Sequence, residues 1–363
     1  MIKNIQKALC LQYNEREEVV EGMLVALIAR QHALLIGPPG TGKSALVSSL
    51  TNRITGSNYF QWLLTRFSTP EELFGPVSLK ELEQGVYKRN TASKLPEAHI
   101  SYLDEIFKGN SAILNALLTV INERIYYNNG GIEQCPLMTL IGSSNEYPEE
   151  GEGLEALFDR FLIRFEVDYI GEEQSFLSML RGSSPLPADM SLEELYQLQF
   201  YSDTVEIPDE VFDTLGKIRN ELKDEGIRPS DRRFKQSLSV IRAKAVLDGR
   251  DQARVDDVMI LKNSLWERPE QRGKVSEIVR KHAQDFVKSM IEDIQLELTE
   301  IVGSLTENNT AEQAVEVTKK LKMLQNDLQQ LRDTYPNRTE AVDMALATVS
   351  KSLKQVASQV LGV

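Results

Sequence analysis

The sequence has few cysteines, no long apolar run and no spacing of cysteine and histidine that suits a metal ion. Only Cys10 and Cys135 are present, which allows one disulfide but excludes a disulfide framework. No apolar run approaches the roughly 20 residues that a membrane-spanning helix requires. The first residues, MIKNIQK, lack the apolar centre of a secretory signal peptide. We therefore expect a soluble, cytoplasmic protein that does not insert into a membrane.

The chain also lacks clustered positive charge. Its formal net charge is −13, and its lysines and arginines are dispersed along 363 residues. Neutralising a nucleic-acid backbone needs clustered cations, so the balance disfavours a broad nucleic-acid face and leaves only a local basic groove. Hydrophobic residues make up 41% of the chain, which is ample for a packed core. The length suits two or three domains of about 150 residues each.

What the sequence does contain is a phosphate-binding loop. Residues 37–44 read GPPGTGKS and match the pattern G-x-x-x-x-G-K-[ST] at every fixed position. The apolar run at 33–36 before the loop is typical of a buried strand. Apolar residues recur at helical spacing after it, so we expect a helix that starts at about Lys43. A chance glycine-proline loop is the alternative, and the flanking strand and helix disfavour it.

The residue types in this loop suit a nucleotide. Glycines let successive backbone N–H groups turn around a phosphate, and the helix N-terminus adds a positive dipole. The side chain of Lys43 can reach the outer phosphates, and the Ser44 hydroxyl can ligate Mg²⁺. The predicted nucleotide-binding residues of the loop are Gly37, Pro38, Pro39, Gly40, Thr41, Gly42, Lys43 and Ser44.

Apolar strands alternate with amphipathic helices in the first half of the chain. This order predicts an α/β fold in which a parallel sheet is covered by helices on both faces. The expected strands are 33–36, 59–63, 100–103, 138–142 and 162–167, and the expected helices include 17–30 and 111–124. An Asn-Gly pair at 129–130 predicts a hairpin turn in the segment 126–132.

The second half of the chain is predicted to be helical. The segment 181–187, RGSSPLP, is a composition break, and residues 207–266 have a helical pattern in which Ser230 suits an N-cap. Apolar residues in the last part step alternately by four and three in three stripes, which predicts a three-helix bundle or helical hairpin. The stripes could instead dock on a partner helix. They are Val287, Ile291, Ile294, Leu298, Ile301, Leu305; Ala314, Val317, Leu321, Leu324, Leu328, Leu331; and Val342, Leu346, Val349, Leu353, Val356, Val360.

Two predicted strands end in polar residues that suit phosphoryl transfer. Asp104 and Glu105 follow the run ISYL, so we expect Asp104 to hold Mg²⁺ and Glu105 to polarise the water that attacks the γ-phosphate. Asn145 ends the fourth strand, where its amide can hydrogen-bond the γ-phosphate and that water. Each feature alone is common by chance, and it is their order behind a phosphate loop that indicates catalysis.

With these motifs, the chain resembles an AAA+ ATPase. The segments 65–76 (TRFSTPEELFGP), 103–106 (LDEI), 117–124 (LLTVINER) and 157–161 (LFDRF) are similar to the MoxR group, most closely to its RavA branch. The resemblance covers about residues 10–268. It implies a parallel-sheet AAA+ P-loop core at 1–185 and a small all-α lid domain at 186–268, followed here by a C-terminal helical bundle at 269–363.

The resemblance also implies a homo-oligomeric ring, usually a hexamer, with ATP and Mg²⁺ bound between subunits. Arg160 matches the family's arginine finger, which would reach the ATP of the neighbouring subunit, and Arg164 is a weaker candidate. Arg232, at the start of a lid helix, matches the family's second sensor, which contacts the γ-phosphate from the small helical domain; Arg233, one residue away, is the alternative for this contact. The alternative for each is an ordinary surface or ion-paired arginine. Residues 70–96 and the hairpin at 126–137 resemble insertions that commonly face the ring pore or axial surface.

MoxR-group ATPases typically act with a protein that carries a von Willebrand A domain. The sequence departs from the RavA pattern after residue 270, where relatives carry a β-rich insertion that binds an enzyme, and this puts an enzyme-binding role in doubt. We therefore expect an ATPase that remodels or activates protein partners. The alternatives are a nucleic-acid motor, which the acidic balance disfavours, and a nucleotide-binding scaffold without catalysis, which the intact Lys43, Asp104, Glu105 and Asn145 disfavour.

Overall fold

The computed structural model describes most of the chain in two units. The described residues are 1–148, 153–182, 186–283, 286–303, 311–334 and 339–361. Their contacts divide the chain into Met1–His282 and Ala283–Val363, and each unit is described here by itself. In these ranges, no helix is both long enough and apolar enough to cross a membrane.

Five parallel strands form the central sheet of the first unit. The strands are β1 (Ala33–Ile36), β3 (Tyr59–Leu63), β4 (Ile100–Asp104), β7 (Thr139–Ser144) and β8 (Ile163–Glu166). Their order is β3-β4-β7-β1-β8, and every neighbouring pair is parallel. Strands β1 and β7 are buried along their whole length, which explains why their sequences do not alternate between apolar and polar residues. The predicted α/β fold is confirmed.

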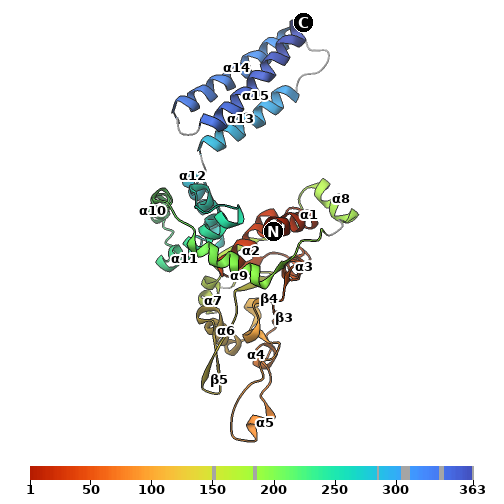
Figure 1. The fold of residues 1–363 in the computed structure, drawn as a ribbon, viewed down its shortest axis with the longest axis vertical. Helices are drawn as coiled ribbons and strands as arrows, with labels where there is room; N and C mark the ends of the chain where they lie inside the picture. Colours follow the sequence, from red (N-terminus) through yellow and green to blue (C-terminus); the bar gives the residue numbers. More distant parts are fainter. Residues whose placement is uncertain (149–152, 183–185, 284–285, 304–310, 335–338, 362–363) are drawn as a thin grey trace. The chain divides into compact units, whose positions relative to one another are not determined.

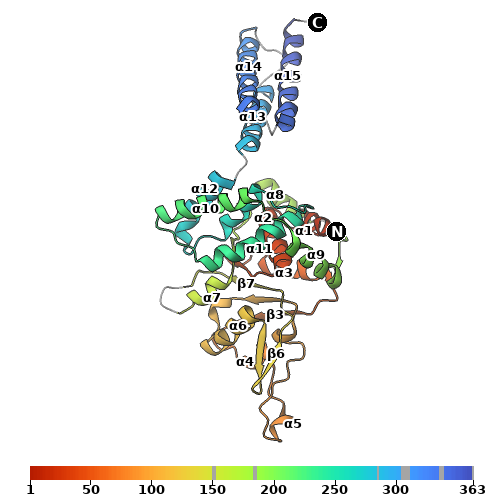
Figure 2. The same ribbon diagram turned by 60° about the vertical axis from the view of Figure 1, so that its left-hand side comes forward.

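Helices cover both faces of this sheet. Helices α2 (Glu17–Ala29) and α3 (Lys43–Thr51) lie against one face, and α6 (Ser111–Glu123) lies against the other, where α7 (Glu155–Arg160) packs on it (Figure 2). Helix α2 is buried on nearly all sides because it also packs against α11 (Asp231–Leu247). Because these strands are parallel, the carboxyl ends of β1, β4 and β7 lie at the same edge of the sheet.

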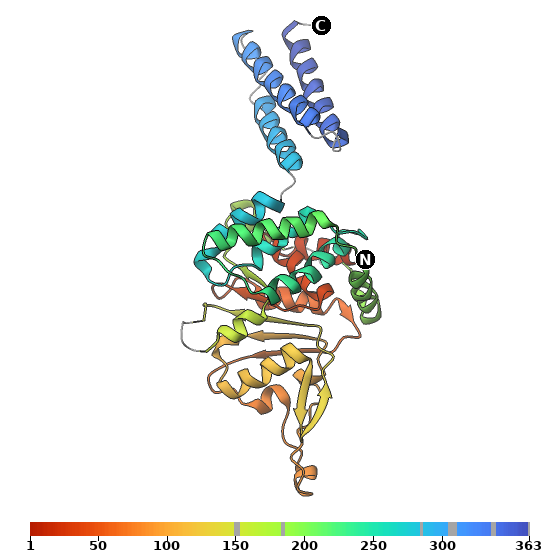
Figure 3. The same cartoon turned by 90° about the vertical axis from the view of Figure 1, so that its left-hand side faces the viewer.

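The predicted hairpin is confirmed and lies beside the segment after α4 (Pro70–Phe74). Strands β5 (Ile125–Asn128) and β6 (Gly131–Gln134) are antiparallel, and their turn residues Asn129 and Gly130 have φ of 53° and 72°. Asn128 joins the two insertions, since it accepts from the Arg89 N–H at 2.8 Å and donates to the Arg89 carbonyl at 3.0 Å. The hairpin and α5 (Leu79–Leu82) extend from the same end of this unit (Figures 1 and 3).

The rest of the first unit is mainly helical, as the sequence predicts. Its remaining elements are α1 (Ile2–Gln12), β2 (Ile54–Thr55), α8 (Glu173–Arg181), β9 (Met190–Ser191), α9 (Leu192–Thr204), α10 (Asp209–Asp224), α12 (Arg272–Ala283) and 3-10 turns at Leu95–Glu97, Ile106–Lys108, Val255–Asn263 and Pro269–Gln271. Ser230 caps α11, because its hydroxyl accepts the N–H of Arg233 at 3.2 Å.

The second unit consists, in its described residues, of α13 (Phe286–Gly303), α14 (Ala311–Thr334) and α15 (Thr339–Leu361). Helix α14 packs against both others. The apolar stripes pack on one another, which confirms intramolecular packing rather than docking on a partner helix. The buried core contains Ile291, Ile294, Leu298, Ile301, Val317, Leu321, Leu324, Leu328, Leu331, Val342, Ala345 and Val349. The side chains of Val287, Leu305, Ala314, Val356 and Val360 lie outside the described residues.

Helix α12 gives a test of the domain division, which stays a prediction. Its side chains Val275, Ile278 and Val279 are fully buried in the first unit. A chain that ends after His282 should bind ATP, and its melting temperature should equal that of the first unit in the full-length protein. A chain that ends after Arg268 should be several kcal/mol less stable, because each lost apolar side chain contributes about 1.5–3 kcal/mol. Equal melting temperatures of the two shortened chains in calorimetry would contradict this boundary.

Asp248, at the end of α11, gives a test of how the lid helices are held. Its carboxylate pairs with Lys3 at 2.6 Å, Lys244 at 3.1 Å and Arg250 at 3.2 Å. Burial raises the pKa of Asp248, but the hydrogen bonds and charges of Lys3 and Lys244 outweigh it and lower the pKa from 3.8 to about 2. Because the folded pKa is depressed, its stabilisation is complete well above pH 4 and is lost as the pH falls through about 2.

Asp248→Asn should therefore lower the free energy of unfolding by about 1–2 kcal/mol at pH 7. The difference from the unchanged protein should shrink below pH 4 and vanish near pH 2 in denaturant titrations. A difference that is constant over this range would show that the carboxylate charge has no part in it.

Candidate active site

The phosphate loop is fixed by the strands on either side of β1. The N–H of Gly37 donates to the carbonyl of Ser144 in β7 at 3.1 Å. A Cβ atom at Gly37 would lie 2.1 Å from the carbonyl oxygen of Val167, which follows β8, so only glycine fits there. Gly42, with φ of 82°, provides the left-handed turn into α3. The loop therefore presents the N-terminus of α3 at the carboxyl edge of the sheet.

Lys43 lies inside this loop. Its Nζ donates to the carbonyls of Gly37 at 2.6 Å and Pro38 at 2.9 Å, and to the amide oxygen of Asn145 at 3.3 Å. Burial lowers the pKa of Lys43, and the carboxylates of Asp104 and Glu105 offset part of this effect. The structure thus brings Lys43 and Asn145 together, from α3 and the end of β7.

Asp104 ends β4 within a cluster of hydroxyl groups. Its carboxylate accepts from Ser44 at 3.4 Å and, in a shorter hydrogen bond, from Ser143. The hydroxyl of Tyr102 lies between them, 3.0 Å from Ser44 Oγ and 2.7 Å from Ser143 Oγ. Burial raises the pKa of Tyr102 to about 12, so this hydroxyl stays neutral. The sequence did not identify Tyr102 and Ser143, although Tyr102 precedes Asp104 by two residues and so shares its side of the strand.

Glu105 is fixed by contacts on both carboxylate oxygens. It has a left-handed φ of 54°, and its side chain is largely buried. The amide of Asn145 donates to Oε1 in a short hydrogen bond, and Lys108 Nζ lies 3.1 Å from Oε2. A continuous path of contacts thus joins Lys43, Asn145 and Glu105. Lys108 is a further residue that the sequence did not indicate.

The oxygen donors beside the loop suit a magnesium ion. Ser44 Oγ and Asp104 Oδ2 lie 3.4 Å apart, and hydroxyl and carboxylate oxygens are the hard ligands that Mg²⁺ takes. Among the described residues, no group of three or more histidine, cysteine and acidic side chains could hold a metal alone. Mg²⁺ usually keeps several waters and binds phosphate oxygens of the substrate as well.

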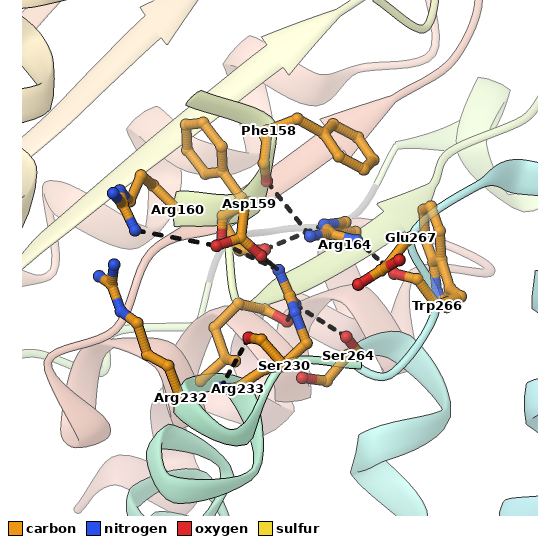
Figure 4. A network of polar contacts seen from close by, with 12 residues as sticks. Phe158, Asp159, Arg160, Arg164, Ser230, Arg232, Arg233, Ser264, Trp266 and Glu267 are labelled. Atoms are coloured by element: carbon orange, nitrogen blue, oxygen red, sulfur yellow. Dashed lines mark hydrogen bonds and ion pairs between the residues drawn. The ribbon is translucent and has the colours of Figure 1, made fainter. Parts of the chain in front are cut away.

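The two arginines expected to act in catalysis lie apart from this cluster. Arg160 ends α7, and its guanidinium is 3.8 Å from the carboxylate of Asp159. The exposed Arg232 near the start of α11 donates to Asn122 of α6 at 3.2 Å. Figure 4 shows both side chains pointing to the same side, away from the buried contacts around them. The structure therefore brings Arg160 and Arg232 together, but not with Lys43.

Arg164 and Arg233 are buried instead. Each is 1% exposed. Arg233 donates to the carbonyls of Leu162 and Ser264 and to Asp159, so its fork is occupied (Figure 4). Arg164 donates to the carbonyl of Phe161 at 3.0 Å and lies over the ring of Phe158, 4.0 Å from its centre. Of these four arginines, Arg232 is exposed and Arg160 is partly exposed, so a phosphate could reach these two.

The sheet order, the phosphate loop and the acids at the end of β4 together define a P-loop protein of the AAA+ class. Two family profiles match: residues 1–196 match the MoxR domain of the MoxR-vWA-beta-propeller ternary systems, and residues 210–279 match an AAA lid domain. The chain belongs to the MoxR family of AAA+ ATPases. The closer resemblance to the RavA branch stays a prediction.

Similar proteins agree with this assignment. The uncharacterized protein MJ0812 of Methanocaldococcus jannaschii is 41% identical over 308 residues, which is 84% of this chain and 80% of that protein. The chaperone MoxR1 of Mycobacterium tuberculosis is 29% identical over 191 residues, 51% of this chain and 49% of that one. The crystal structure of a putative ATPase from Cytophaga hutchinsonii has a TM-score of 0.63 at 18% identity and covers 77% of this chain and 93% of that chain. At this identity, the last likeness shows the fold alone.

Tyr102→Phe tests the hydroxyl cluster. Removing one hydroxyl leaves Ser44 and Ser143 without their shared partner, and a lost hydrogen bond costs about 1 kcal/mol. We expect the Mg²⁺ concentration that gives half-maximal ATP affinity in calorimetry to rise about fivefold. The control is Tyr59→Phe, whose hydroxyl bonds Gln61 at 3.0 Å on β3. An equal effect of the two substitutions would show that Tyr102 does not organise the site.

Proposed function

We propose that this chain hydrolyses ATP with Mg²⁺ as a subunit of a homo-oligomeric ring, usually a hexamer in its family, and uses the energy to remodel or activate a protein partner. The observation that carries the proposal is the connected cluster at the carboxyl edge of the sheet. It contains Lys43, Ser44, Asp104, Glu105 and Asn145, which are joined by hydrogen bonds. These are the groups that phosphoryl transfer to water requires.

Each group has a role that follows from its chemistry. The loop N–H groups and Lys43 bind the phosphates of ATP, while Ser44 and Asp104 hold Mg²⁺, which would neutralise charge on the transferred phosphoryl group. Glu105 accepts the proton of the attacking water, and Asn145 orients that water and the γ-phosphate. Since Asn145 also contacts Glu105, the same amide can position both the base and its water.

Arg160 and Arg232 suggest that the site is completed by a neighbouring subunit. A loose phosphoryl transition state needs cations beyond Lys43 and Mg²⁺. These two arginines are accessible, but their contacts lie with Asp159 and Asn122 rather than with the phosphate loop of their own chain. We infer that both arginines act on the ATP of the adjacent subunit.

The description of the family supports a proposal for the partner. Its profile is described as the MoxR domain of ternary systems with vWA and beta-propeller proteins. We propose a von Willebrand A domain protein as the partner of this chain, in the cytoplasm, with the name of the chaperone MoxR1 supporting a remodelling role. The hairpin β5–β6 and the α5 segment are the proposed pore-facing or axial parts.

Mixing two inactive variants tests the ring and the trans arginine together. Arg160→Ala should bind ATP normally but hydrolyse it about 10³–10⁵ times more slowly, as an upper guide from other trans arginines. Lys43→Ala should not bind ATP tightly. In randomly mixed rings, about a quarter of the interfaces pair an intact loop with an intact arginine, so activity should return.

The measurement is the ATPase rate against mixing ratio, after subunit exchange has been confirmed by labelled chains. The expected curve peaks near equal amounts of the two variants. A flat line at the rate of the separate variants would rule out a trans arginine, and Arg160→Lys, which keeps the charge, provides the matched control.

A further inference from the structure

The carboxylate of Asp159 is placed between two arginines from different parts of the first unit. Its Oδ1 accepts from Arg233 Nη2 at 2.8 Å, and its Oδ2 lies 3.8 Å from Arg160 Nη1. Arg233 belongs to the lid helix α11, whereas Asp159 and Arg160 belong to α7 of the core. One carboxylate therefore contacts both the expected finger and the lid.

Arg233 holds this junction with nearly its whole guanidinium. Besides the Asp159 carboxylate, it donates to the carbonyls of Asp159 at 2.9 Å, Leu162 at 3.2 Å and Ser264 at 2.8 Å. The Asp159 carbonyl belongs to α7 and the Leu162 carbonyl lies just before β8, whereas Ser264 follows the lid turn Val255–Asn263. Arg233 thus ties the end of α7 to the lid at a point next to Arg232 (Figure 4).

This junction is costly to bury. Burial lowers the pKa of Arg233, and its hydrogen bond and charge interaction with Asp159 oppose that effect. The Arg233 side chain is the buried member of this ion pair, whereas the Asp159 side chain is 41% exposed, so water weakens the contribution of the pair to stability. An apolar pair could replace the contribution of Arg233 and Asp159 to stability, but it could not reproduce the geometry of their hydrogen bonds.

The guanidinium of Arg160 lies near the same carboxylate, at ion-pair distance and without a hydrogen bond. Its Nε is buried and has no hydrogen-bond partner in the described part of the chain. The Asp159 carboxylate is the acidic group that the guanidinium contacts. A small movement of this carboxylate would therefore turn the arginine, and a displacement of about 1 Å at a reacting group can change a rate about 10²-fold.

We propose that Asp159 and Arg233 are positioning residues that fix Arg160 and Arg232 as one unit, so that both arginines engage the neighbouring subunit's ATP only when lid and core are joined. The inference rests on the proposed function, because it needs a trans arginine. It gives the lid control over hydrolysis in the next subunit rather than in its own.

Asp159→Asn tests the inference in the full-length protein. The amide replaces one of the two contacted oxygens with a donating NH₂ group and removes the charge, so it cannot accept from Arg233 on one side and pair with Arg160 on the other, while its size is unchanged. We expect kcat to fall about 10–100-fold with KM and ATP affinity unchanged. Arg233→Lys, which keeps a charge but not the fork, should act in the same direction.

Subunit mixing then assigns the defect to one side of the interface. Asp159→Asn should regain activity when mixed with Lys43→Ala, because the Lys43→Ala subunit supplies an intact Arg160. It should not regain activity with Arg160→Ala, because both variants then have a defective arginine side of the interface. The opposite pattern, rescue by Arg160→Ala alone, would place the defect in the subunit's own ATP site and overturn the inference. Rescue by neither variant would also overturn the inference, because it would indicate a folding defect. An unchanged kcat would overturn it because Asp159 would then have no role in hydrolysis.

Two controls make the result specific. Asp248→Asn removes a carboxylate that pairs with cations at the other end of α11, so it should lower thermal stability and leave kcat unchanged. Lys43→Ala mixed with Arg160→Ala tests the underlying trans mechanism. If this last pair fails to complement, the proposed ring is wrong and the inference falls with it; if it complements, the outcome with Asp159→Asn decides the inference alone.

Discussion

The position of β1 between β7 and β8 is the constraint on which the rest of the site depends. Hydrogen bonds on both sides hold the strand. The loop after it lies so close to the Val167 carbonyl that there is no room for a side chain at Gly37. Because the neighbouring strands are parallel, their carboxyl ends bring Asp104 and Asn145 to the same edge. A shift of one strand would separate the phosphate-binding loop from the groups that act on water.

The cations proposed to act on ATP lie at two places in the first unit. Lys43 lies within the loop, whereas Arg160 and Arg232 are carried by the ends of α7 and α11. The second place is built on buried guanidinium groups, since Arg164 and Arg233 use backbone carbonyls of core and lid as acceptors. An arrangement of this kind links the accessible arginines to the packing of the lid, and it suits an enzyme whose site is shared between subunits.

Much of this fold follows from the sequence because its signals are local. Apolar runs and strand-end acids predict β1, β4 and the loop, and Asn129-Gly130 predicts the hairpin turn. The hydroxyl partners of Asp104 could not be predicted, because Tyr102 and Ser143 become neighbours only when β4 pairs with β7.

The two adjacent arginines of α11 show the same limit. Successive residues on a helix point about 100° apart, so only the docking of the helix decides that Arg233 is buried and Arg232 exposed. The sequence alone does not distinguish the two arginines. Arg164 is another such case, since a strand residue next to the lid can be buried only once Trp266 covers it.

The most direct test of a shared site is a cryo-electron microscopy structure of the Glu105→Gln variant with ATP and Mg²⁺. The substitution keeps the shape of the side chain and removes the charge that polarises water, so ATP should remain intact. The account predicts a closed ring in which Arg160 and Arg232 of one subunit lie within hydrogen-bond distance of the γ-phosphate bound by Lys43 of the next. Arginines directed at the ATP of their own subunit, or ATP-bound monomers, would contradict it.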